Sequence, residues 1–254
     1  MKRFISNKYV LTILGCFLFL AIWIIISLAV NDTKMIFPDP LSTVKETFRI
    51  LSTSYVYKCI GWTMLRMVIG FSASFILALL FGVLAGHFKW LKTLLNPIII
   101  ALKSIPTAAL VFLFLVIIGA RYAPIFIVIL ISFPILYEAI SAGIANVPNE
   151  LIEASLVDGA KWYDLAFKMR LPLSIPYILV GIASSFALSF KIEIMAEIIT
   201  GDTRNGLGSA ISAAQKSDPS NMVTIFAYSL IAIVFILLIT IIEDIVSRSF
   251  KRKY

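Results

Sequence analysis

The stretch Glu153 to Pro172, EASLVDGAKWYDLAFKMRLP, lies between two long apolar runs, yet it carries acids, bases, a glycine and a tryptophan. Its apolar residues recur with a helical rather than a loop-like spacing. Gly159 interrupts this pattern, which predicts two short helices that meet at the glycine. The sequence therefore inserts a polar, helix-forming segment between two regions that are apolar enough to lie in a membrane.

The composition of the whole chain is that of a polytopic membrane protein. Its 254 residues are 60% hydrophobic and 14% charged, with a mean hydropathy of +0.99. These values exclude an ordinary soluble domain. Because a helix needs roughly 20 apolar residues to cross the hydrocarbon core, we expect an all-α protein with six transmembrane helices, at 9–30, 62–86, 94–119, 124–145, 173–199 and 222–246.

The third of these spans is interrupted by polar and proline residues. Asn96-Pro97 and the segment Lys103 to Pro106 break its pattern. We therefore expect part of 91–104 to lie at the cytoplasmic interface before the chain crosses the membrane.

The distribution of basic residues predicts the orientation. The formal net charge is +8, and twelve lysines and arginines fall on one side of a six-span arrangement against seven on the other. The first group is Lys2, Arg3, Lys8, Lys89, Lys92, Lys161, Lys168, Arg170, Arg248, Lys251, Arg252 and Lys253, and the second is Lys34, Lys45, Arg49, Lys58, Arg121, Arg204 and Lys216. Both termini and the 146–172 loop are thus expected in the cytoplasm, and the basic ends are topology signals rather than a nucleic-acid site.

Two regions are distinguished along the chain. Residues 1–59 are expected to form a peripheral transmembrane helix, which is not cleaved, and an extracytoplasmic amphipathic helix whose apolar positions are Val44, Phe48 and Leu51. Residues 60–254 are expected to form the transmembrane core. On its outer face, Ser209 to Gln215 is compatible with a short helix.

Residues for catalysis or for cofactor binding are not apparent. His87 is the one histidine, Cys16 and Cys59 are expected at different depths, and the sequence contains no phosphate-binding loop or paired-histidine motif. We therefore expect no enzyme activity, no cofactor and no metal. A membrane-embedded enzyme is disfavoured, whereas a channel or secondary transporter without an ATPase remains an alternative.

The opening stretch resembles the signature of one transporter family. Glu153-Ala154-Ser155, then Gly159, Met169 and Leu171-Pro172, are similar in order and spacing to the signature of the membrane subunits of binding-protein-dependent ABC importers, and depart from it at Ser155 and Met169. Four further segments resemble the nitrate, sulfonate and taurine-type branch: Phe37 to Pro40, Thr63 to Phe71, Leu102 to Pro106, and Ala196 to Ile199 with Gly206 to Gly208.

The resemblance implies a type I ABC importer permease in a prokaryotic plasma membrane. Two permease chains, as a homodimer or a related pair, would form the path, two separate ATPase subunits would bind below, and an extracytoplasmic solute-binding protein would deliver the substrate. The 146–172 loop would be the coupling helix, with Glu153, Ala154, Ser155, Gly159, Leu171 and Pro172 as its coupling residues. Glu153 would supply a polar contact and Gly159 a bend that a side chain would crowd. Nitrate, sulfonates, taurine and vitamin precursors all remain open as substrates.

Charged residues inside the spans are candidates for function, because each costs at least ~2.5–3.5 kcal/mol at the middle of a helix. Arg66 and Lys103 lie near span ends and are expected to reach the headgroups. Glu193 and Glu197 share one face of the fifth span, and Lys191 lies about 200° from Glu193 around the helix. These three residues either line the translocation path or form a buried ion-pair network that fixes helix packing.

Overall fold

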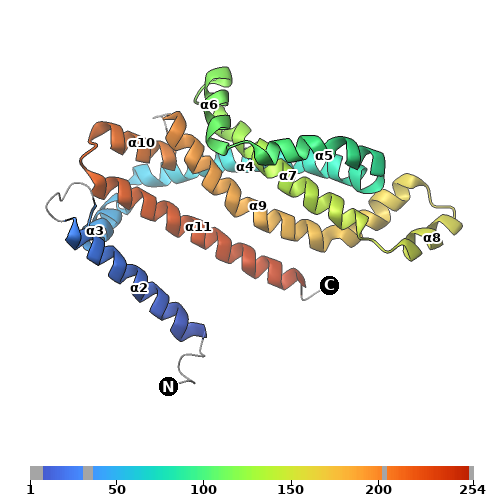
Figure 1. Cartoon of the computed structure of the whole chain (residues 1–254), viewed down its shortest axis with the longest axis horizontal. Coiled ribbons are helices and arrows are strands. Elements are labelled where there is room, and N and C mark those ends of the chain that lie inside the picture. Colours follow the sequence, from blue (N-terminus) through green and yellow to red (C-terminus); the bar gives the residue numbers. More distant parts are fainter. Residues whose placement is uncertain (1–7, 31–36, 202–204, 252–254) are drawn as a thin grey trace.

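The structure of the protein is a computed structural model that describes residues 8–30, 37–201 and 205–251. It is helical throughout, with no strand in these ranges, as the sequence predicts. The helices are α2 (Lys8–Ala29), α3 (Pro40–Leu51), α4 (Ser54–His87), α5 (Lys89–Ser104), α6 (Thr107–Ile118), α7 (Ala123–Ala145), α8 (Asn149–Val157), the π-helix η2 (Asp164–Arg170), α9 (Leu171–Thr200), α10 (Leu207–Ser217) and α11 (Met222–Lys251). Figure 1 shows α4, α5, α7, α9 and α11 side by side, with α8 at one end of the bundle and α3 and α10 at the other.

Five of the described helices are long and apolar enough to cross a membrane, and the bent pair α5 and α6 makes a sixth if it is counted as one span. The expected third span, 94–119, is thus two helices that meet at 95°. The chain turns because Ile105 and Pro106 adopt extended rather than helical backbone angles, as expected for a residue that precedes proline and for the proline itself. The second span begins at Ser54, eight residues before its expected start.

The bundle is organised by close contacts of α7 with α4 and α9. A Cβ atom added to Gly70, Gly82 or Gly86 of α4 would meet Val128, Ile140 or Ile144 of α7 at 2.5–2.9 Å. The offset between contacting residues is 58 at all three places, so α4 and α7 run parallel. Small residues allow this approach in lipid, where helix association depends on van der Waals packing.

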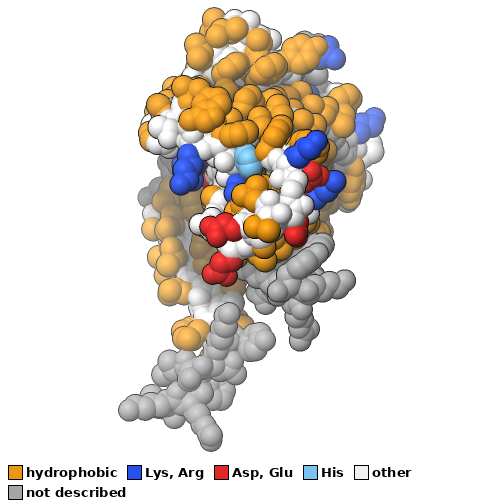
Figure 2. All heavy atoms as spheres, turned by 90° about the vertical axis from the view of Figure 1, so that its right-hand side faces the viewer, with side chains coloured by type: hydrophobic (Ala, Val, Ile, Leu, Met, Phe, Trp, Pro, Cys, Tyr) orange, Lys and Arg blue, Asp and Glu red, His pale blue; other side chains and the backbone are white. Residues whose placement is uncertain are grey.

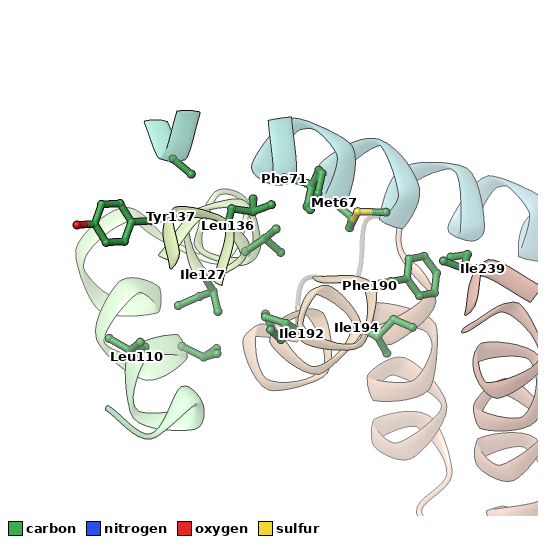
Figure 3. Close-up of a cluster of buried hydrophobic side chains, with 14 of the residues drawn as sticks. Met67, Phe71, Leu110, Ile127, Leu136, Tyr137, Phe190, Ile192, Ile194 and Ile239 are labelled. Atoms are coloured by element: carbon green, nitrogen blue, oxygen red, sulfur yellow. The ribbon is translucent and has the colours of Figure 1, made fainter. Parts of the chain in front are cut away.

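The third helix of the bundle runs in the opposite direction. A Cβ atom on Gly143 of α7 would meet Ser174 and Tyr177, one on Gly181 of α9 would meet Ala139, and the Ser132 and Ser189 hydroxyls lie 2.7 Å apart. These pairs make α9 antiparallel to α7. Figure 3 shows the core between the helices, with Met67 and Phe71 of α4, Ile127 and Leu136 of α7, and Phe190, Ile192 and Ile194 of α9.

The N-terminal helix α3 lies at the end of the bundle remote from α8 (Figure 1). α3 begins after Asp39, which accepts hydrogen bonds from the Ser42 hydroxyl and backbone N–H, and these bonds hold the pKa of this exposed carboxyl below its usual value. α3 packs against α11 and buries Thr43 and Ile50, whereas the expected apolar positions Val44 and Phe48 are exposed. This exposure suits contact with the membrane rather than with the bundle.

α2 stands apart from the bundle in Figure 1. It reaches the outer segment through Trp23, whose indole N–H donates to the Pro38 carbonyl at 3.1 Å. Cys16 of α2 is exposed and Cys59 of α4 is buried, both as free thiols. Several basic residues used for the orientation, Lys2, Arg3, Lys34, Arg204, Arg252 and Lys253, lie outside the described residues.

The glycine contacts between α4 and α7 predict a position-specific effect of a single methyl group. Gly86→Ala places a Cβ 2.5 Å from Ile144 Cβ, and relieving this overlap should destabilise the protein by about 1–3 kcal/mol. The matched variant is Gly61→Ala in the same helix, where nothing lies within 4 Å of the added atom. That variant should be neutral or slightly stabilising, because alanine favours a helix by up to about 1 kcal/mol over glycine.

The measurement is the midpoint of heat-induced aggregation of the purified protein in detergent. Equal midpoints for the Gly86 and Gly61 variants would contradict the close packing of α4 on α7.

Candidate functional site

The 146–172 loop forms a projection at one end of the bundle, between the spans α7 and α9. No residue of α8 is buried, and Leu151, Leu156 and Val157 are exposed apolar side chains on it. Figure 2 looks onto this end, where acidic and basic side chains surround an apolar patch. A solvent-facing helix with exposed apolar side chains has the character of a surface that docks on another protein.

Gly159 ends α8 through its backbone conformation. Its φ is +82°, in the left-handed region that glycine adopts without strain. The turn is closed by hydrogen bonds from Gly159 N–H to the Leu156 carbonyl and from Ala160 N–H to the Ser155 carbonyl, both at 3.0 Å. Nothing lies within 4 Å of an added Cβ. The expectation that a side chain would be crowded here is therefore wrong: the requirement is for the backbone angle, not for space.

The second half of the loop is held against the bundle. Arg170 Nη1 lies 3.2 Å from His87 Nδ1 at the end of α4, and the Trp162 ring lies 5.9 Å from that of Phe88 between centroids. Leu165 and Ala166 are buried. The expected second short helix is the π-helix η2, which continues without a break into α9. The loop is therefore anchored to α4 on one side and fused to α9 on the other.

The two positions that depart from the family signature contact each other. The Ser155 hydroxyl donates to Met169 Sδ at 3.2 Å and also to the Leu151 carbonyl at 2.9 Å. This contact joins α8 to η2 across Gly159. The other proposed coupling residues are divided between the two halves of the loop: Glu153 and Ala154 are exposed on α8, while Leu171 and Pro172 form the first turn of α9.

A second site lies at the C-terminal end of α9, where Glu197 is enclosed in a polar cluster. Arg66 Nη1 lies 2.7 Å from Glu197 Oε1, and the Thr63 hydroxyl donates to the same carboxylate at 2.9 Å. The Gly208 N–H donates to Glu197 Oε2 at 2.9 Å, and the Leu207 N–H donates to the Thr63 oxygen at 2.8 Å. Glu197 thereby binds the first turn of α10 and joins it to α4.

The cluster brings together segments that are far apart in the sequence. Arg66 also donates to the Asn205 carbonyl at 2.7 Å, and its side chain is 12% exposed. The expectation that Arg66 reaches the headgroups is therefore not what the structure shows, because its partner is Glu197. Two of the segments that resemble the importer branch, 63–71 and 196–199 with 206–208, meet here. The spacing of residues within one helix could not reveal this pair, which is separated by 131 positions.

Glu193 and Lys191 lie on different sides of α9. Glu193 is fully buried, and neither of its carboxylate oxygens has a hydrogen-bond partner among the described residues. Lys191 is exposed. The three charged residues considered together in the sequence therefore occupy three environments, since Glu197 is paired with Arg66. The contacts of Glu197 favour a role in fixing helix packing. The exposure of Lys191 is compatible with a position along the translocation path.

A second ion pair between helices involves Lys103, which was expected to reach the headgroups. Lys103, where α5 ends, lies 2.8 Å from Glu138 of α7, and both side chains are about half exposed. Each lies in a segment rich in apolar residues, so only the fold reveals that they meet. The pair joins the last turn of α5, next to the break before α6, to α7.

Comparison with known proteins identifies the family. Residues 78–253, more than half of the chain, match the model of the binding-protein-dependent transport system inner membrane component. Curated relatives include the riboflavin transport system permease protein RibX of Chloroflexus aurantiacus, 28% identical over 84% of this chain and 80% of the relative. The nitrate import permease protein NrtB of Leptolyngbya laminosa is 25% identical over 93% of this chain and 86% of the relative.

Further matches agree in family and in fold. The putative aliphatic sulfonates transport permease protein SsuC of Bacillus subtilis is 26% identical over 80% of this chain and 74% of that protein. Among solved structures, the inward-facing MetNI methionine ABC transporter has a chain of the same fold, with a TM-score of 0.65 and 19% identity over 77% of this chain and 95% of that chain. This chain belongs to the family of binding-protein-dependent transport system inner membrane components, the permease subunits of ABC importers.

Proposed function

We propose that this chain forms the translocation path of an ATP-driven uptake system as one of two permease chains, most simply a homodimer. A solute-binding protein delivers a small solute from the outer side, and two separate ATPase subunits bind on the cytoplasmic side. The observation that carries this proposal is the projection formed by α8. It is exposed, bears apolar side chains, and is joined through Gly159 and η2 to a span that crosses the bundle.

The arrangement of the loop supports a role in coupling. Closure of an ATPase dimer has to move a rigid projection in order to rock the membrane helices. Ser155 ties α8 to η2, and His87 and Trp162 tie η2 to the end of α4. Glu153, Ala154, Ser155 and Gly159 thus lie on the docking side, while Leu171 and Pro172 begin the helix that receives the movement.

The orientation with α8 and both termini in the cytoplasm is part of the proposal. Lys89, Lys92, Lys161 and Lys168 belong to α5 and to the loop, at the end of the bundle that carries α8. An excess of lysine and arginine marks the cytoplasmic side of a membrane protein.

Within the membrane, we assign different roles to the charges of α9. Glu197 is proposed to fix the position of α10 against α4, because all its contacts are within the outer cluster. Lys191 is proposed to line the path between two permease chains, because it is exposed on a single chain. Glu193 lies between Lys191 and Glu197 in the sequence of α9 and is fully buried. We propose that it links changes at the path near Lys191 to the packing of the helices around Glu197.

The central experiment is copurification of the permease with a separate ATP-binding subunit. Replacing Leu156 and Val157 of α8 by glutamate should reduce the amount of ATPase recovered by at least about tenfold, because a charge buried in an interface without a partner costs more than 1.4 kcal/mol. The matched control is Gln215→Glu together with Ser217→Glu at exposed polar positions where α10 ends, which should leave recovery unchanged. Solute transport by the permease alone in liposomes would instead support a channel or secondary transporter and refute the proposal.

The turn at Gly159 provides a second prediction. Gly159→Val should abolish most solute-stimulated ATPase activity and uptake, because a β-branched residue at φ +82° is strained by about 1–3 kcal/mol. Gly159→Asn is the matched control, since asparagine tolerates the left-handed conformation and the open space accepts either side chain. It should retain most of both activities. Equal activities for the two variants and the unmodified transporter would show that the shape of this turn does not matter for coupling.

The outer cluster provides a third prediction. Arg66→Met leaves the Glu197 carboxylate buried without its counter-charge, which should destabilise the folded protein by about 3–5 kcal/mol. The double variant Arg66→Met with Glu197→Gln removes both charges and should recover part of this loss. The yield of monodisperse protein and its thermal midpoint measure the effect. A stable Arg66→Met protein that has lost only uptake would assign the pair to the path instead.

A further inference from the structure

We propose that Lys191 makes the translocation path selective for solutes that carry a negative charge, such as a carboxylate, sulfonate, nitrate or phosphate. The inference rests on the proposed function, because it requires that the path runs along α9. It adds the charge class of the substrate, which neither the fold nor the family determines.

The depth of Lys191 follows from the helix contacts. Ser189 contacts Ser132 of α7, and by the offset of 58 residues Ser132 lies level with Ser74 of α4. Lys191 follows Ser189 by about half a turn, which brings it level with the middle of α4, a helix that runs from Ser54 to His87. It therefore lies near the centre of the membrane. A four-carbon stem cannot carry its ammonium group across the roughly 15 Å from the midplane to the headgroups.

Lys191 belongs to one exposed face of α9. The other members of this face recur at three- and four-residue spacing and are Leu173, Tyr177, Val180, Ser184 and Leu188. Tyr177, Val180 and Ser184 also line an open groove of about 490 Å³ between α9 and α7. The exposed face thus runs from the end that carries α8 to the middle of the membrane, and Lys191 is its one charged residue.

Within the described residues, the Lys191 ammonium group has no counter-charge in contact with it. Lys191 forms no ion pair or hydrogen bond with any residue in the described ranges. The other cations at membrane depth are paired, Arg66 with Glu197 and Lys103 with Glu138. Glu193 is close in sequence but points into the bundle, where it is fully buried. The exposed face of α9 is therefore positively charged at its midpoint.

A charge in this position requires either water or an anion. Exposure of the ammonium group to lipid would be costly, and charges inside membranes accordingly face water-filled cavities or partners. In a narrow aqueous path with apolar walls, one cation raises the local concentration of anions and lowers that of cations. Lys191 is thus suited to attract an anionic solute to the middle of the path and to disfavour a cationic one.

The experiment measures this potential without knowledge of the solute. Cys16 and Cys59 are replaced by alanine, and Ser184→Cys introduces one thiol in the groove, two helical turns or about 10 Å from Lys191. The assembled permease–ATPase complex is placed in nanodiscs of neutral phosphatidylcholine, so that lipid supplies no net charge. The probes are two methanethiosulfonate reagents, one with an anionic sulfonatoethyl group and one with a cationic trimethylammonioethyl group.

The readout is the reaction rate of the anionic reagent divided by that of the cationic reagent, at low ionic strength. This ratio is normalised by the same ratio for a free thiol in solution. Lys191→Met should lower this ratio by about fourfold or more, the effect of one charge at 10 Å on reagents of opposite sign in water. Lys191→Arg should preserve the ratio. Lys58→Met, which removes an exposed cation at the outer end of α4, should also leave it unchanged.

Two outcomes would overturn the inference. A thiol at 184 that reacts with both reagents at rates independent of Lys191 would show that the ammonium is neutralised, for example by a carboxylate of the second chain. A thiol that reacts with neither reagent would show that this face of α9 is covered. Recovery of the ATPase with the same variants tests the proposed function separately, because α8 is unchanged in all of them.

Discussion

The close approach of α4 and α7 is the constraint on which the rest of the structure depends. Three glycines of α4 leave no room for even a methyl group between the two helices. In lipid, where the hydrophobic effect gives no drive for helices to associate, such contacts supply the packing energy and fix the register. Because α7 continues into the loop and pairs with α9, this register sets the depth of α8, of Lys191 and of Glu197 in one step.

The charged side chains Glu197 and Lys191 of α9 have opposite environments. At the C-terminal end of α9, Glu197 is surrounded by a cation, a hydroxyl and a backbone N–H group, so that it links three helices that an apolar side chain could not hold in one register. On the exposed face of α9, Lys191 has no such surroundings. Charges inside a membrane are retained either for specific packing or for function, and the roles proposed for Glu197 and Lys191 correspond to these two cases.

Much of the fold follows from hydropathy, since the length of an apolar run is fixed by the thickness of the bilayer. The expected spans 124–145 and 173–199 agree with α7 and α9 within two residues. The sequence also identifies the 146–172 loop and its break at Gly159. It does not reveal the 95° angle between α5 and α6, because Pro106 predicts a break but not a direction. Nor does it reveal the partners of Arg66 and Lys103, since these contacts depend on helix register. The sequence also predicts the wrong reason for the glycine at position 159. Only the φ angle of +82° shows that glycine is required there for its left-handed backbone conformation and not for lack of space.

The unbroken connection from η2 to α9 has a mechanical consequence. From Leu171 to Thr200 the helix contains 30 residues and is about 45 Å long. With no loop between η2 and α9 to absorb a displacement, the helix acts as a stiff lever, with the groove and Lys191 along its length. A tilt of about 10° at one end displaces the other by about 8 Å, on the order of the width of a helix. A small rotation of the loop that contains η2 would therefore displace α10, whose first turn is bound by Glu197.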